Sequence, residues 1–484
     1  MYLLIFEPGK DFMFKKILVA NRGEIAMRVI RACREFNIAT VAIYAECDAT
    51  AIYVKKANEA YLVGPGPVQG FLDAKQIVGL AKRVGADAIH PGYGFLAENA
   101  AFAQLCQEAG ITFIGPTPQA LELLGDKVRA RELAKQVGVP VVPGTDGPVK
   151  TLEEGLKFSS SVGYPVMVKA SAGGGGRGLR VVRSDEELQE AMESGAREAL
   201  AAFGNADLFI EKYVERPHHI EFQLLADKYG YMVHLGERDC SIQRRHQKLI
   251  EIAPSLILTP RLRAQMGETA ISLARAAGFH NAGTIEFLLD QDGRYFFIEM
   301  NPRIQVEHTV TEQISTVDIV QSQIWIAAGR PLVFSQHEIT LQGYAIQCRI
   351  NAEDPQNGFR PSSGKITGYL SPGGVGVRID GVVYKDYTVP PFYDALLTKL
   401  TVQGRTWDET VRRTHRSLEE FVLRGVKTTI PFLMKIMEEP DFRAGRFDTS
   451  YLDIHQDLYD YEHSLEPEDL VAALSAAIAA YEGL

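Results

Sequence analysis

Residues 284–308 have the sequence TIEFLLDQDGRYFFIEMNPRIQVEH, which predicts a β-hairpin followed directly by a polar segment. Aromatic and β-branched residues on both sides of Asp292-Gly293 are typical of two strands joined by a two-residue turn. With that turn, position 291 pairs with 294, and counting back along the ladder places Glu286 opposite Glu299. The sequence therefore predicts two carboxylates that face each other across the hairpin.

These carboxylates indicate a metal site. Like charges directly opposite in a ladder are destabilising unless a cation lies between them. Asn301, two residues beyond the second glutamate, would project from the same face and add a neutral oxygen. Such an all-oxygen set suits Mg²⁺ or Mn²⁺, with the phosphates of a nucleotide completing the shell. The alternative is an exposed hairpin whose glutamates face water. The alternating polar residues Arg303, Gln305 and Glu307 favour the metal site.

The composition is that of a globular protein with room for about three domains. The 484 residues are 46% hydrophobic, and a net charge of −10 argues against a nucleic-acid partner. The five cysteines are far apart and lack zinc or disulfide-framework spacing, which favours a reducing, cytoplasmic location. No apolar run reaches about 18–20 residues, so no membrane span is expected. Residues 1–12 lack the apolar core of a signal peptide and are treated as an extension.

The chain changes its pattern along its length. Residues 15–115 alternate short apolar runs with helical segments, which predicts βαβ units and a parallel sheet. NRGEIA at 21–26 replaces a GxGxxG fingerprint, which weakens a dinucleotide-binding interpretation. Residues 342–405 are rich in strands and Gly/Pro turns, and an Ala-rich helix starts at Pro467. The fold class expected is α/β combined with α+β.

A glycine-rich loop follows the apolar strand that ends near Lys169. Residues 171–178, SAGGGGRG, would let backbone N–H groups wrap a polyanion, and Lys169 and Arg177 would add positive charge. This is not a Walker A loop, because the lysine precedes the glycines. The alternative is a flexible linker, but linkers seldom interrupt a strand–turn–strand unit. We therefore expect a phosphate-binding loop that its ligand orders.

A cluster of cations lies at 237–248, ERDCSIQRRHQK, which we interpret as one charged loop. It holds Arg238, Arg244, Arg245, His246 and Lys248 in a chain that is acidic overall. The alternative is an exposed basic loop. We favour an anion site, with Lys248 and His246 facing the substrate.

Together these motifs resemble the biotin carboxylase family of ATP-grasp enzymes, from about Lys15 to beyond Arg405. The resemblance is carried by KILVANRGEIA at 16–26, HPGYGFLAEN at 90–99, VMVKASAGGGGRG at 166–178, EKYVERPHHIE at 211–221, ERDCSIQRRHQK at 237–248, FIEMNPRIQVEH at 297–308 and CRINAEDP at 348–355. It departs from the common pattern at Pro302, often threonine, which should stiffen the turn. Ala172 lies in a loop that is often all glycine, which should slightly reduce lid mobility.

The resemblance implies a domain organisation. It predicts a Rossmann-like N-terminal domain at 13–125 and an ATP-grasp domain at 126–330 with a lid at about 142–213. A mixed β C-terminal domain would occupy 340–450, followed by a helical tail at 451–484. ATP would lie between two sheets.

The resemblance also implies residue roles. Phosphate contacts would come from Lys127, Lys169, Gly175 and Gly176; adenine contacts from Glu211, Lys212 and Val214; and other pocket contacts from His219, Gln243 and His246. The residues Glu286, Glu299 and Asn301 would bind the metal. Bicarbonate would be held by Lys248, Arg303, Gln305 and Val306, with Glu307 as general base and Arg349 facing biotin. The implied reaction carboxylates biotin with bicarbonate and ATP through carboxyphosphate.

Two other functions remain as alternatives. A carbamoyl-phosphate-forming ATP-grasp ligase would share the phosphate and metal ligands, but RIQVEH together with CRINAEDP points to biotin. A non-catalytic nucleotide-sensing subunit would be expected to lack Glu307, Lys248 or a metal carboxylate, and all are present.

Biotin is expected on a separate carrier protein. The Met-Lys pair Met434-Lys435 could pass for a biotinylation site, but Pro431 and the apolar spacing around it predict a helix. The chain should act as a stand-alone subunit with a carrier and a separate carboxyltransferase, and as a homodimer. The tail helix at 467–481 could help to dock one of these partners. The final acceptor stays open among acetyl-CoA, propionyl-CoA, pyruvate and 2-oxoglutarate.

Overall fold

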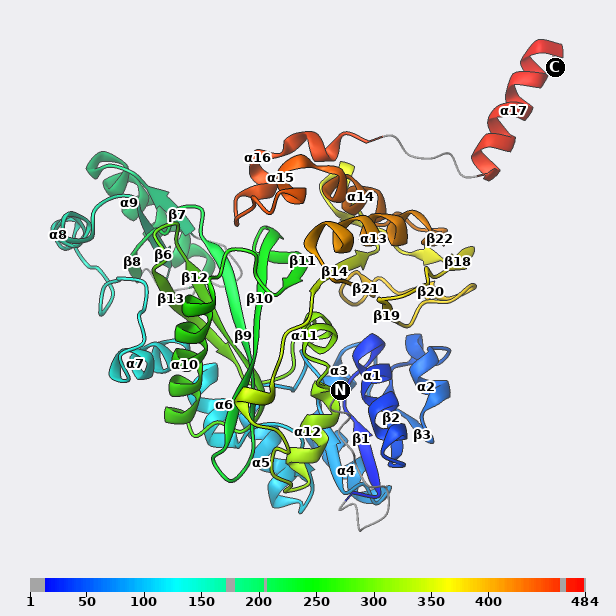
Figure 1. Ribbon diagram of the computed structural model, residues 1–484, viewed down its shortest axis with the longest axis horizontal. Coiled ribbons are helices and arrows are strands. Elements are labelled where there is room, and N and C mark those ends of the chain that lie inside the picture. The colour runs from blue at the N-terminus through cyan, green and yellow to red at the C-terminus, as the bar shows by residue number, and fades with distance from the viewer. Residues whose placement is uncertain (1–13, 171–178, 204–206, 462–466, 483–484) are drawn as a thin grey trace.

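The computed structural model describes residues 14–170, 179–203, 207–461 and 467–482 (Figure 1). Gly175 and Gly176 of the predicted phosphate loop lie outside the described residues. The expected combination of α/β and α+β architecture is confirmed: a parallel sheet near the N-terminus is followed by antiparallel sheets.

The N-terminal part is a parallel sheet covered by helices. Its strands lie in the order β3-β2-β1-β4-β5, and each neighbouring pair in that order is parallel, as the alternating pattern predicts. The elements are β1 (Lys16–Val19), α1 (Gly23–Glu35), β2 (Ala39–Tyr44), α2 (Ile52–Lys56), β3 (Glu59–Leu62), α3 (Gln69–Leu72), α4 (Ala74–Arg83), β4 (Ala88–His90), α5 (Ala100–Glu108) and β5 (Thr112–Phe113). The first strand leads through Asn21-Arg22 into α1, where Gly23 has a φ of +66° that favours glycine.

A long antiparallel sheet forms the centre of the molecule. Its strand order is β13-β12-β9-β10-β11-β14-β21-β19. The strands are β9 (His218–Ala226), β10 (Met232–Arg244), β11 (Gln247–Ala253), β12 (Asn281–Leu289), β13 (Tyr295–Asn301), β14 (Tyr344–Asn351), β19 (Val377–Gly381) and β21 (Leu396–Gly404). The sheet is continuous from the predicted ATP-grasp region into the predicted C-terminal region, because β11 pairs with β14. Side chains from both regions therefore share one sheet surface.

Helices pack on this sheet and connect its parts. They are α6 (Pro118–Gly125), α7 (Lys127–Gln136), α10 (Pro260–Ala276), α11 (His308–Ser315) and α12 (Ile319–Ala327). Phe222, Phe287 and Met300 of the sheet form a buried core with α7 and α10. Helix α11 contacts β10, β11, β14 and β21, and so lies over the middle of the sheet.

A smaller unit stands beyond the large sheet at the upper left of Figure 1. Its sheet has the order β7-β6-β8 and is antiparallel. The elements are α8 (Leu152–Val162), β6 (Val166–Ala170), β7 (Leu179–Val182), α9 (Asp185–Phe203) and β8 (Leu208–Lys212). Lys169 lies near the end of β6, directly before the glycine-rich segment, as the sequence predicts.

The C-terminal part surrounds β14 and β21 with short strands and helices. These are β15 (Glu353–Asp354), β16 (Arg360–Pro361), β17 (Gly364–Lys365), β18 (Gly368–Leu370), β20 (Thr388–Val389), α13 (Trp407–Glu419), β22 (Val422–Arg424), α14 (Ile430–Glu438), α15 (Pro440–Arg443), α16 (Tyr451–Ile454) and α17 (Pro467–Glu482). Lys435 lies in α14 and contacts Glu438, so the predicted helix at Met434-Lys435 is confirmed. Helix α17 stands apart from the rest of the molecule in Figure 1.

The hairpin at 281–301 confirms one prediction and corrects another. Glu286 does pair with Glu299. The two-residue turn is wrong: Asp290 pairs with Arg294 through an N–H···O bond of 2.8 Å, which leaves a three-residue loop. A β-bulge at Ile298 adds one residue to β13 and cancels that offset. The two carboxylates thus meet despite the different turn.

The charged segment 237–248 is also different from the prediction. It is not one loop, since most of it belongs to strands β10 and β11. The two strands are joined at Arg245-His246, where φ values of 48° and 64° match the left-handed turn of a tight hairpin. Arg238 is fully buried in β10, where carboxylate and hydroxyl partners from neighbouring segments satisfy it. Its charge therefore did not mark an exposed loop.

Candidate active site

Lys248 is the centre of a buried charge network on the large sheet. Its Nζ atom lies 2.6 Å from Glu221, 3.1 Å from Glu286 and 2.7 Å from Glu307. Burial by itself lowers the pKa of Lys248, but the carboxylates outweigh that effect and raise the pKa well above its ordinary value. The lysine therefore stays positively charged where a bicarbonate anion is expected.

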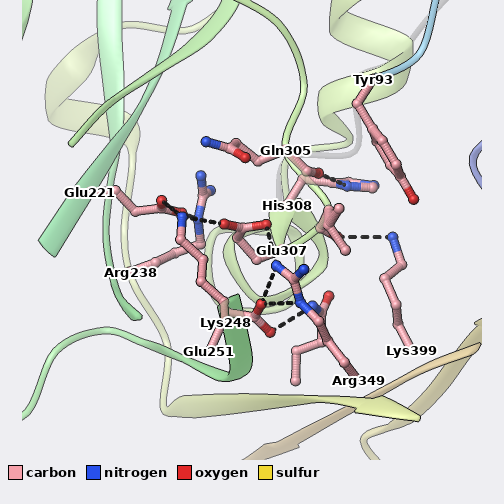
Figure 2. Close-up of polar contacts among 12 residues, drawn as sticks. Tyr93, Glu221, Arg238, Lys248, Glu251, Gln305, Glu307, His308, Arg349 and Lys399 are labelled. Atoms are coloured by element: carbon pink, nitrogen blue, oxygen red, sulfur yellow. Dashed lines mark hydrogen bonds and ion pairs between the residues drawn. The ribbon is translucent and has the colours of Figure 1, made fainter. Parts of the chain in front are cut away.

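Glu307 lies where this network meets the C-terminal region, as Figure 2 shows. It is the residue before α11, and its side chain is buried. Its other oxygen, Oε2, lies 3.1 Å from Nη2 of Arg349 on β14. Burial raises the pKa of Glu307, but Lys248, Arg349 and Arg238 reverse the shift and hold the pKa far below its ordinary range. Glu307 is therefore ionised, and its basicity would rise if a substrate anion drew these cations away.

Arg303 and Gln305 line the segment between the hairpin and α11. Arg303 Nε lies 2.9 Å from Glu98, and Nη2 donates to Asn301 at 3.0 Å. Gln305 Nε2 donates to Glu286 at 2.9 Å. The carbonyl of Val306 accepts a 2.9 Å hydrogen bond from the buried Lys399. Arg303 and Gln305 are thus linked to Lys248 through Asn301 and Glu286.

The predicted metal ligands come together on the hairpin. Asn301 Nδ2 lies 2.9 Å from Glu286 and 3.4 Å from Glu299, while Lys127 Nζ is 2.9 Å from Glu299. Burial raises the pKa of Glu286, but Lys248 and His219 lower it well below its ordinary value, so this carboxylate is also ionised. Two carboxylates and an amide at one place fit a hard divalent cation such as Mg²⁺ or Mn²⁺. The residues Glu286, Glu299 and Asn301 would hold it.

The predicted nucleotide residues divide into two groups. His219 contacts Glu286 at 2.6 Å, and Lys169 forms an ion pair with Glu211 across β6 and β8. Lys212 Nζ donates to the carbonyls of Gly163 and Tyr164, at the base of the small unit. Lys169 and Glu211 therefore belong to the smaller unit, and His219 to the large sheet.

Three further residues that were predicted to contact the nucleotide lie at or just beyond the ends of strands. Gln243 pairs with Lys248 across the hairpin of β10 and β11. His246 is exposed in the turn of that hairpin, and its contact with the substrate stays a prediction. Val214 lies just beyond the end of β8.

The sequence did not identify several residues that complete the site. Glu221 contacts both Lys248 and the buried Arg238. Glu251 contacts Arg349, with Nη2 2.5 Å away. A signal for Glu221 was present, because His219, Glu221 and Gln223 alternate along one face of β9. Glu251 gave no such signal, since its partner lies on a strand about a hundred residues later.

Models of known families match nearly the whole chain. "Biotin carboxylase, N-terminal domain" matches residues 13–121, "Carbamoyl-phosphate synthase L chain, ATP binding domain" matches 126–334, and "Biotin carboxylase C-terminal domain" matches 347–454. The model of the ATP-binding module is named for carbamoyl-phosphate synthases, so the two flanking biotin carboxylase modules decide which family the chain belongs to.

The chain belongs to the biotin carboxylase family.

Curated relatives of this family span almost the full chain. The 2-oxoglutarate carboxylase small subunit of Hydrogenobacter thermophilus is 56% identical, covering 98% of this chain and 100% of the relative. The biotin carboxylase of a Nostoc species is 53% identical, covering 91% and 98%. A pyruvate carboxylase subunit of Methanothermobacter thermautotrophicus is 50% identical, covering 97% and 99%. Two of these names specify different acceptors, 2-oxoglutarate and pyruvate, and the third specifies none.

Solved structures of the family have the same fold. The H. thermophilus 2-oxoglutarate carboxylase biotin carboxylase domain dimer, solved with MgADP, ADP and bicarbonate, has a TM-score of 0.88 and 56% identity over 93% of this chain and 100% of that one. A Campylobacter jejuni biotin carboxylase complex with β-γ-ATP has a TM-score of 0.86 and 44% identity, covering 92% and 100%.

Proposed function

We propose that this chain is an ATP-dependent ligase that carboxylates biotin on a carrier protein, with bicarbonate as the carbon source. The observation that carries the proposal is the placement of two cations, Lys248 and Arg349, on opposite oxygens of the buried Glu307. A buried carboxylate between two positive groups can accept a proton while the cations hold anionic reactants. The family membership supports the same activity.

In the first half of the reaction, Lys248 and Arg303 hold bicarbonate beside Glu307. The carboxylate takes the proton of bicarbonate as a bicarbonate oxygen attacks the γ-phosphorus of ATP, and ADP leaves. Lys169 and Lys127 stabilise phosphate charge. Bicarbonate competes with Glu307 for Lys248, which raises the basicity of the carboxylate at the moment it is needed. A divalent cation held by Glu286, Glu299 and Asn301 would neutralise charge on the phosphates.

In the second half, carboxyphosphate releases CO₂ and phosphate next to biotin. Phosphate removes the proton of the ureido nitrogen, and Arg349 stabilises the enolate that attacks CO₂. The products are carboxybiotin, ADP and phosphate. The separate acceptor, bound by a carboxyltransferase, then receives the carboxyl group, so this chain needs no acceptor site of its own.

The assigned residue roles and the limits 13–125, 126–330, 340–450 and 451–484 form part of this proposal. We also propose a homodimer, a separate carrier and carboxyltransferase, and a cytoplasmic location. The dimer is supported by the H. thermophilus relative, solved as a dimer. In the described part of the chain, no helix is long and apolar enough to cross a membrane.

The proposal is tested by measuring ATP turnover with and without free biotin. The rate should depend on bicarbonate and Mg²⁺, and it should rise when biotin is added. A rate that ignores biotin but rises with ammonia would instead favour a carbamoyl-phosphate-forming ligase.

A further inference from the structure

Glu251 lies on β11 next to the site, and it has no role in the reaction described above. Its side chain is fully buried. One oxygen, Oε1, accepts a hydrogen bond from Nε of Arg349 at 2.6 Å and lies 2.5 Å from Nη2 of the same residue. A guanidinium contacted through two nitrogens has little freedom to rotate.

The other oxygen of Glu251 is held from the neighbouring strand. Gln347 lies directly opposite Glu251 in the ladder of β11 and β14, and its Nε2 donates to Oε2 at 2.8 Å. Gln347 in turn accepts a hydrogen bond from Thr309 of α11. Both oxygens of Glu251 are therefore fixed, and the carboxylate cannot follow Arg349 if the arginine moves.

Arg349 is a single cation between two carboxylates. Its Nη2 atom is 2.5 Å from Glu251 and 3.1 Å from Glu307. Figure 2 shows the guanidinium between these two side chains. Among the residues that the structure describes, no hydrogen-bond partner contacts the third nitrogen, Nη1. Nη1 can therefore contact a substrate, while Nε and Nη2 are paired with the two carboxylates.

We propose that Glu251 is a positioning residue that holds Arg349 beside the reacting groups and keeps it from pairing fully with Glu307. The inference rests on the proposed function. Without the charge of Glu251, the guanidinium would be attracted by Glu307 alone. Arg349 would then leave the place where biotin is expected, and Glu307 would become a weaker base.

The electrostatics of the two carboxylates agree with this competition. Burial raises the pKa of Glu251, and Arg349 opposes the shift. Burial also raises the pKa of Glu307, but its cations overcome the effect and lower it. Each carboxylate would be stabilised by an exclusive ion pair with Arg349, so the position of the guanidinium depends on both.

The test is a double-mutant cycle between Glu251→Gln and Arg349→Ala. Glu251→Gln keeps the volume and removes the charge. Alone, it should lower biotin-dependent ATP turnover about 10–100-fold, because small misplacements of reacting groups carry costs of that size. In the Arg349→Ala background it should change turnover, with or without biotin, by no more than about twofold, since Glu251 would act only through Arg349.

Glu237→Gln is the matched control. Glu237 is also a fully buried glutamate of the same sheet, but it pairs with Arg263 and accepts a hydrogen bond from the backbone N–H of Ser255, and no contact with Arg349 or Glu307 is seen among the described residues. This variant should leave biotin-dependent turnover within about twofold, and its effect should be additive with Arg349→Ala. Melting curves of all variants separate lost stability from lost activity.

The inference is overturned if Glu251→Gln retains full activity, or if its effect multiplies with that of Arg349→Ala as for an independent site. If Arg349→Ala does not fold, Arg349→Gln replaces it. Glu251→Asp, which keeps the charge but shortens the reach, must also lower turnover. Failure of the proposed function is distinguishable, because the ATP turnover of the wild-type chain would then not rise when biotin is added.

Discussion

The Nζ atom of Lys248 and the Oε1 atom of Glu307 lie 2.7 Å apart in a buried ion pair. The pair joins the sheet that carries the nucleotide residues to the helix that starts at His308. A substrate anion that binds Lys248 must therefore enter the same space as the carboxylate. This placement makes Glu307 the residue whose chemistry responds first when bicarbonate binds.

Replacing Glu307 by Gln should leave ATP binding normal and slow bicarbonate-dependent ATP cleavage about 10²–10⁴-fold, the usual cost of losing a positioned base. The change removes a charge but little volume. The measurements are the Kd for ATP and the steady-state rate. A variant that failed to bind nucleotide would show that Glu307 belongs to the ATP site instead.

Glu299→Gln should keep the fold and lose most Mg·ATP turnover. Loss of a direct ligand should exceed the roughly 10–100-fold cost typical of residues that support ligands from outside. Turnover is measured against Mg²⁺ concentration, with Asp292→Asn as a control in the exposed turn of the same hairpin. Near-normal activity at saturating Mg²⁺ would refute the metal assignment.

Arg349→Ala should separate the two half-reactions. ATP cleavage with bicarbonate should survive in part, because Lys248 and Arg303 still hold the anion. Carboxybiotin formation should collapse, because the enolate loses its cation. Parallel assays of ADP and carboxybiotin measure the ratio, and an equal loss of both activities would mean that Arg349 has a structural role.

Lys435 should not become biotinylated. It lies in helix α14, whereas a biotin-accepting Met-Lys pair needs a β-hairpin tip. Expression with an active biotin ligase, followed by streptavidin detection, should give no signal from this chain. Mass spectrometry that found biotin on Lys435 would show that the carrier function is not on a separate protein.

The sequence predicted the parallel N-terminal sheet, the pairing of Glu286 with Glu299 and the helix at Lys435, because each depends on local patterns. The turn of the hairpin was harder to predict from the sequence. Asp290 binds backbone and side chain of Arg294, and that choice competes with the simpler Asp292-Gly293 turn. The pairing of the glutamates survived because the bulge at Ile298 compensates for the longer loop.

The partners of the buried charges could not be predicted from sequence. The sequence predicted an anion site at Arg238 and Lys248, but no neighbour in the sequence shows which carboxylates will face these two cations. Glu221 on β9 contacts both cations, and Glu286 and Glu307 supply two further carboxylates to Lys248 from distant parts of the sequence. The buried cations are stable here only because carboxylates are buried beside them. The identity of these charge partners is set by the tertiary structure.

The central claim is tested most directly by following labelled bicarbonate. The purified chain is incubated with ¹⁴C-bicarbonate, Mg·ATP and free biotin, and both ADP and acid-labile label on biotin are measured. The account predicts label on biotin that needs ATP, disappears in Glu307→Gln and matches the biotin-stimulated part of ADP formation. ATP cleavage that proceeds with no label on biotin at any biotin concentration would contradict it.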